Sequence, residues 1–180
     1  MDRPKTVDVA LDLKIIKISG KWEPSNVERK AAWELYVELV TRIGVVPLDN
    51  GILRESLNSL HSIFGSSREI LRRYGPEVAE PGSDGGFSFG YLSVAVLNFT
   101  LRPFLSYWHP ELSSWEDTRP TGASAVEHQA AWSRSGELRS EIETVRISLT
   151  NFSALLARVC GVPDLLHAVP VRYDPNIGVS

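Results

Sequence analysis

Apolar side chains recur at helical spacing through most of the chain, most regularly between residues 124 and 160. Their steps alternate between four and three residues, which keeps one face of a helix against its neighbours for several turns. These positions are Leu138, Ile142, Val145, Leu149, Phe152, Leu156 and Val159. Ser124 and Glu127 have the spacing of a capping box, and Gly161 followed by Pro163 is a stop signal. We expect the longest helix here, opening at Ser124.

Similar patterns predict two more helices nearer the N-terminus. Ser25 and Glu28 form another capping-box pattern, followed by a helical run of apolar positions at Val27, Ala31, Leu35, Leu39 and Ile43. Asp49 or Asn50 can cap the next helix, which we expect to close at Gly75. Its apolar positions are Leu53, Leu57, Leu60, Phe64, Leu71 and Tyr74, a spacing typical of a helix in a bundle.

Residues 87–101 form the most apolar stretch, with no charge and with polar side chains only at Ser88, Ser93, Asn98 and Thr100. A helix that is apolar nearly all round is central, so we expect a buried core helix. The stretch is shorter than the ~18 uncharged apolar residues of a membrane span. Pro103 should stop or kink this helix near Arg102, and His109 with Pro110 gives a second turn signal.

Both ends of the chain are predicted to be extended. Val7, Val9, Leu11, Leu13 and Ile15 alternate with polar or small residues, as in a half-buried strand. The segment from His167 to Tyr173 alternates in the same way, so the two ends are candidates for pairing. We therefore expect one all-α domain over residues 1–180. It comprises an extended segment 1–24, an antiparallel four-helix bundle at 25–160 and a tail at 161–180.

Composition narrows the function classes only a little. The net charge of −3 gives no general attraction to nucleic acid, and no DNA-reading motif is found. Cys160 is the single cysteine, which excludes an internal disulfide and a cysteine-based zinc cage. Charged residues interrupt the N-terminal apolar positions, so no signal-peptide core is present and we expect a cytoplasmic protein without a membrane segment. We expect no cofactor and no metal.

Arg102 and His109 are the candidate catalytic residues. An offset of seven places both on about the same face of a continuous helix. An arginine can stabilise an anionic phosphoryl transition state while a histidine moves protons, which suits RNA cleavage through the 2′-hydroxyl. The motif RPFLSYWH on a helical protein resembles the HEPN family of metal-independent ribonucleases and nucleotide-binding modules. The resemblance implies a composite ribonuclease site at a dimer interface. Pro103 departs from the family, where a polar residue usually follows the arginine.

Two other interpretations compete with a ribonuclease site. In the structural one, Arg102 caps carbonyls or pairs with an acid, and His109 caps a helix end. In the other, His61, His109 and His128 resemble the histidine set of DinB-like metal-dependent bundles. No His-x-x-x-His or Glu-x-x-His pair supports a metal site.

The leading hypothesis is a non-catalytic accessory module of a larger bacterial system that binds a protein partner, with a second copy of the chain as one option. Catalytic motifs of other kinds are absent, and tryptophan and arginine are the residues that dominate interface hot spots. The candidate binding residues are Tyr107, Trp108, Arg68 and Arg72. A solvated helix surface is the default interpretation of the arginines. A ribonuclease, with RNA as its partner, requires Arg102 and His109 to share an exposed groove.

Overall fold

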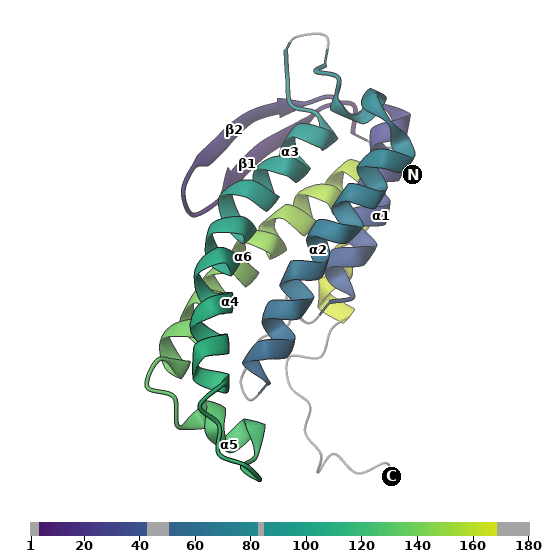
Figure 1. Cartoon of the computed structure of the whole chain (residues 1–180). Helices are drawn as coiled ribbons and strands as arrows, with labels where there is room; N and C mark the ends of the chain where they lie inside the picture. The colour runs from purple at the N-terminus through teal and green to yellow at the C-terminus, as the bar shows by residue number, and fades with distance from the viewer. Residues whose placement is uncertain (1–3, 43–50, 83–84, 169–180) are drawn as a thin grey trace, which may run out of the picture.

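The computed structural model describes residues 4–42, 51–82 and 85–168, and it is mostly helical with a small two-stranded antiparallel sheet (Figure 1). Successive long helical segments alternate in direction in this view, from α1 through α2 and α3–α4 to α6. The α-helices are α1 (Asn26–Val40), α2 (Leu53–Tyr74), α3 (Phe89–Val96), α4 (Arg102–Glu116), α5 (Ala125–Ala130) and α6 (Ser135–Cys160). Short 3-10 turns, η2 (Pro76–Ala79) and η4 (Leu165–Ala168), and the π turn η3 (Leu97–Leu101) complete the helical elements.

The sheet is a hairpin of β1 (Val7–Asp12) and β2 (Lys17–Trp22). The alternation that predicted β1 is confirmed for Val7, Val9 and Leu11, which are buried between exposed residues, but Ile15 lies beyond the strand and is exposed. Within the described residues β1 pairs with β2, the next segment of the chain, and not with the C-terminal candidate. A hairpin closes a short loop, which costs less chain entropy than joining the two ends. Residues 169–173 lie outside the described part of the chain.

Helix α1 begins as expected. The Ser25 Oγ accepts from the Glu28 amide at 3.1 Å, and the Glu28 Oε2 accepts from the Ser25 amide at 2.7 Å. Helix α2 also starts close to the expected place, but Asp49 and Asn50 lie outside the described residues. Its first amide, on Leu53, instead donates to the Gln129 Oε1 at 2.7 Å, so the cap comes from α5.

Of the stop or kink expected at Pro103, the stop is wrong, and so is the turn at His109-Pro110, because the chain stays helical from Phe89 to Glu116. Pro103 is the second residue of α4, which directly follows the π turn η3. The disturbance is taken up just before it by η3, where the Arg102 amide donates to the Leu97 carbonyl. Pro110 lies on an exposed face of α4, so water can reach the helix carbonyl that it leaves without a donor.

The single helix expected from Ser124 to Cys160 is two helices. Ser124 does cap a helix, accepting from the amides of Val126 and Glu127, but this helix is the short α5. The chain then turns and buries Trp132 before α6 begins at Ser135. The apolar face predicted for α6 is confirmed, since Leu138, Ile142, Val145, Leu149, Phe152, Leu156 and Val159 are all buried. Gly161 ends the helix in the left-handed conformation, at φ 69°.

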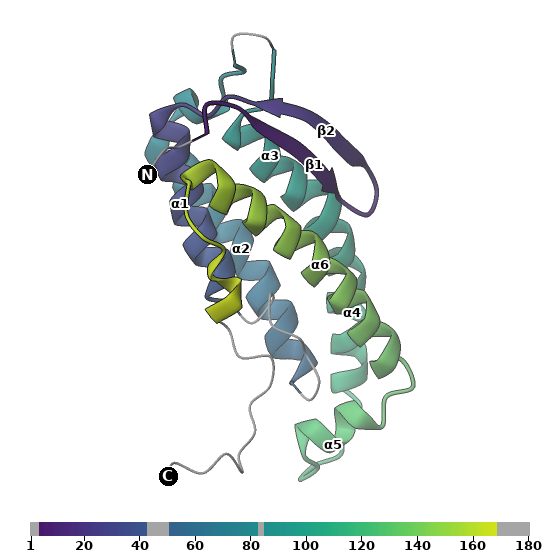
Figure 2. The same ribbon diagram turned by 180° about the vertical axis from the view of Figure 1, so that it is seen from behind.

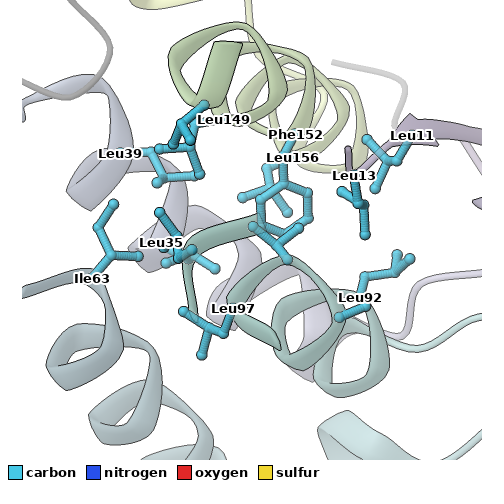
Figure 3. Packing of buried hydrophobic residues seen from close by; sticks show 14 of the residues in the cluster. Leu11, Leu13, Leu35, Leu39, Ile63, Leu92, Leu97, Leu149, Phe152 and Leu156 are labelled. Atoms are coloured by element: carbon cyan, nitrogen blue, oxygen red, sulfur yellow. The ribbon is translucent and has the colours of Figure 1, made fainter. Parts of the chain in front are cut away.

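The core forms where the helices and the hairpin meet. Figure 3 shows Leu149, Phe152 and Leu156 of α6 facing side chains of α1, α2, α3 and the hairpin end. Figure 2 shows the hairpin beside α6 on the back of the molecule, where β1 packs against α6. On the front, α2 and α3–η3–α4 are the outer helices, and they form the walls of the candidate site (Figure 1).

Candidate functional site

A groove runs between α2 and α3–η3–α4, and we call it the α2/α4 groove. Its apolar section, about 690 Å³, lies between the end of α2, η2 and α3. Its cationic section, about 620 Å³, lies between the middle of α2 and α4. Leu71, Val94 and Asn98 line both sections, so the two are continuous. Two chemically different surfaces therefore meet in one groove.

Helix α3 supplies the apolar wall. The buried core helix expected from the sequence is wrong on this face, since Tyr91 and Val94 of α3 and Phe99 of η3 are 54%, 42% and 37% exposed. The opposite face is buried, with Phe89, Leu92 and Val96 in the core. Residues at this spacing share one side of a helix, and we call Tyr91, Val94 and Phe99, which continue from α3 into η3, the α3 stripe.

The cationic section gathers residues from two helices. Arg102 of α4 donates through Nε to the Asn98 Oδ1 at 3.0 Å, and its guanidinium lies 5.4 Å from the centre of the Phe64 ring. Arg68 of α2 donates through Nε to the Phe64 carbonyl at 3.1 Å. Both side chains are exposed, and each keeps its terminal nitrogens without a partner among the described residues. The section therefore presents two guanidinium groups to an incoming ligand.

His61 and His109 lie at the far end of this section. Their rings are edge to face, with centroids 5.8 Å apart. Nη1 of Arg54 lies 2.9 Å from Nδ1 of His109, and since a guanidinium only donates, Nδ1 is the acceptor. The neutral ring then carries its proton on Nε2, which is buried and has no partner among the described residues. The geometry leaves His109 as a hydrogen-bond donor.

The surroundings of His109 lower its pKa from the ordinary value of 6.5. Burial has the largest effect, followed by the positive charge of Arg54 and by His61, while Glu116 opposes them. Arg54 itself is held by Glu116, through Nη2 to Oε2 at 2.6 Å, and by the Ser113 hydroxyl at 2.9 Å. Burial, assisted by a fixed cation, therefore favours the neutral form of His109.

We expect acid to destabilise the fold in part through His109. Between its lowered pKa and 6.5 the unfolded chain binds a proton here that the folded chain does not, so stability falls as the pH falls through this window. Urea unfolding at several pH values between about 5 and 8 should show a smaller loss for His109→Gln than for the parent chain. His128→Gln is the matched control, and an equal reduction in that variant would contradict the assignment.

The aromatic binding residues expected from the sequence lie away from the groove. Trp108 is 3% exposed and packs edge to face against Trp132, with ring centroids 6.1 Å apart. The Arg134 guanidinium covers it at 4.5 Å, and Nη2 of Arg134 donates to the exposed Tyr107 hydroxyl at 2.9 Å. Both aromatic residues thus belong to a packed cluster, and a binding role for them stays a prediction.

Of the other candidate residues, some lie at the groove and others lie elsewhere. Arg68 lines the groove, and Arg72 is exposed one helical turn further along α2. Arg73 turns to the other side and pairs with Glu34 of α1. His128 stacks on Trp115 with the ring centroids 4.5 Å apart, so it does not join His61 and His109. Within the described ranges, no group of three or more histidine, cysteine or acidic residues is arranged to hold a metal.

Sequence reasoning missed two features of the site. Arg54 reaches His109 from the first turn of α2, a contact that no local spacing in the sequence announces. The exposure of the α3 stripe was also missed, because an apolar sequence does not say which elements will cover it.

Of the helices described, none has both the length and the apolar content needed to cross a membrane. Comparison of the chain with protein-family models, with curated proteins and with solved structures finds no match.

Proposed function

We propose that this chain is a cytoplasmic protein-interaction module that binds a protein partner in the α2/α4 groove. The proposal takes α1, α2, α3–α4 and α6 as the antiparallel four-helix bundle expected from the sequence, which holds the groove walls. The observation that carries the proposal is the α3 stripe. Its three apolar side chains lie at helical spacing and stay partly exposed in the groove.

The stripe alone offers only part of a binding free energy. Burying the exposed fractions of Tyr91, Val94 and Phe99 would contribute roughly 2–4 kcal/mol, since fully burying such a side chain is worth about 1.5–3 kcal/mol. Association costs about 4–15 kcal/mol in lost freedom of motion. A stable complex therefore needs further contacts, and the cationic section is continuous with the stripe.

Site-specific photocrosslinking tests this function. A photoreactive residue at Val94 is expected to trap a partner in cells that express the full chain, because Val94 lines both sections of the groove. Ile147 of α6 is the matched control, being 50% exposed on another helix. Tyr91→Lys combined with Phe99→Lys should abolish the crosslink at 94. A crosslink that forms equally at 147, or that survives both lysines, would contradict the proposal.

A metal-independent ribonuclease of the HEPN type is the second candidate. The observation that favours it is that Arg102 and His109 line the same section of the groove, with Arg68 and His61 beside them. In such a reaction the 2′-oxygen attacks phosphorus as it loses its proton to a base, and the leaving 5′-oxygen gains a proton. Two imidazoles and two guanidinium groups can serve proton transfer and charge stabilisation.

The ribonuclease is the second candidate because Arg54 occupies the lone pair that His109 would need to act as a base. A base must offer a free lone pair, and on neutral His109 that lone pair belongs to Nδ1, which already accepts from Arg54. The buried Nε2 carries the proton and can only donate. His109 would act as a base only after Arg54 moved away from Glu116 and Ser113.

A further inference from the structure

We infer that the partner enters the α2/α4 groove as an amphipathic helix that carries an apolar stripe at one end and acidic side chains at the other. The inference rests on the proposed function and names the chemistry of the partner. Three properties of the groove lead to it: its length, the exposure of its walls and the charge of one section.

The length of the groove fits a helix. From Tyr91 to His109 the wall rises by 18 residues, which is about 27 Å at ~1.5 Å per residue. A small ligand is usually buried over most of its surface. The walls here remain exposed, Tyr91 by more than half, so a compact ligand would stay largely in contact with solvent. A helix laid along the groove can cover both sections with side chains spaced by three and four residues.

The charge of the cationic section selects acidic side chains. Among the described residues that line it there is no carboxylate, although the chain as a whole has a net charge of −3. Arg68 and Arg102 line this section with terminal nitrogens that have no partner among the described residues, and a guanidinium can bind a carboxylate through two parallel hydrogen bonds. The Arg54–Glu116 pair beyond this section is already neutralised.

The apolar section favours a protein segment over a nucleic acid as the occupant of the groove. A phosphate backbone would satisfy Arg68 and Arg102, but it would leave Tyr91, Val94 and Phe99 facing water or charge. A helix with a Leu-rich stripe followed by Asp or Glu on the same face satisfies both sections at once. The partner is therefore a protein segment with this order of side chains.

A displayed library of helical peptides of about 18 residues tests the inference with the full-length protein. One half of each peptide carries fixed leucines at i, i+3, i+4 and i+7, and the same face of the other half is randomised among Glu, Gln and Lys. Selection should enrich Glu at the randomised positions. Selected peptides should bind roughly tenfold more tightly than their Gln counterparts, since two partly exposed ion pairs are gained.

Charge reversal in the protein provides the control. The double variant Arg68→Glu, Arg102→Glu should enrich Lys instead of Glu. Lys21→Glu with Arg119→Glu changes the net charge equally at exposed positions outside the groove and should leave the preference for Glu unchanged.

Each remaining outcome overturns a defined claim. Peptides that bind through leucine with no preference for Glu would overturn the acidic partner and leave groove binding standing. No binder of any charge, together with no crosslink at Val94, would overturn the proposed function as well. A single-stranded RNA that displaces the peptides and binds more tightly than they do would assign the cationic section to nucleic acid and overturn the inference.

Discussion

Replacing Glu28 with alanine is expected to lower the free energy of unfolding by about 3–5 kcal/mol, because each buried donor left without its partner costs about 1–3 kcal/mol. Glu28 is 5% exposed. Its Oε1 accepts from the Trp22 indole nitrogen at 3.0 Å and from the Phe89 amide at 2.8 Å, and its Oε2 accepts from the Ser25 amide. Alanine would remove the acceptor for all three donors.

Urea unfolding of the full chain measures this effect. Glu55→Ala is the matched control, since Glu55 also lies in the first turn of a helix but is exposed, and its loss should cost less than about 1 kcal/mol. Glu28→Gln keeps one oxygen and should fall between the two. If Glu28→Ala cost no more than Glu55→Ala, the carboxylate would be no more than a helix cap.

The three bonds of Glu28 matter for the site because they join separate elements. Trp22 ends the hairpin, Ser25 precedes α1 and Phe89 begins α3. One carboxylate therefore fixes where α3 starts relative to α1, and with it the wall of the groove that carries the α3 stripe. The capping box predicted only the local bond to Ser25. The other two bonds depend on chain segments that meet only after folding.

The same difference applies to the rest of the fold: features set by residues close in sequence were predictable, and features set by distant residues were not. The face of α6, the capping box of α1 and the alternation of β1 were predictable, because each depends on residues close in sequence. The continuous helix through Pro103 and Pro110 was not. It depends on a π turn and on an exposed position, and neither has a signature in the order of residues.

The candidate site was predictable to the same limited extent. Arg102 and His109 were found because they share one helix at an offset of seven. Their neighbours His61, Arg68 and Arg54 come from α2, and only packing brings them together. The α3 stripe was misjudged for a related reason. Apolar composition favours burial, but here one face of α3 stays partly exposed in the groove.

Purified protein with a chelator present gives the decisive test of the second candidate. If the cationic section cleaves RNA, His109→Ala is expected to lower the rate by about 10²–10⁴-fold, the usual contribution of a positioned acid or base. Arg102→Ala should lower it by about 10²–10³-fold, as for loss of a donor that stabilises transition-state charge. His128→Ala and Arg119→Ala are the matched controls and should retain full activity.

The pH dependence of that rate would identify which group acts. The pKa of His109 is held below 6.5 by burial and by Arg54, so a base at this position stays unprotonated in mildly acidic solution, and the acidic limb of the rate profile should lie below pH 6.5. Unchanged cleavage in both His109→Ala and Arg102→Ala would show that the activity arises elsewhere. Complete absence of cleavage would reject the ribonuclease. Arg54 would then be understood as a structural contact of His109 that occupies its Nδ1 lone pair.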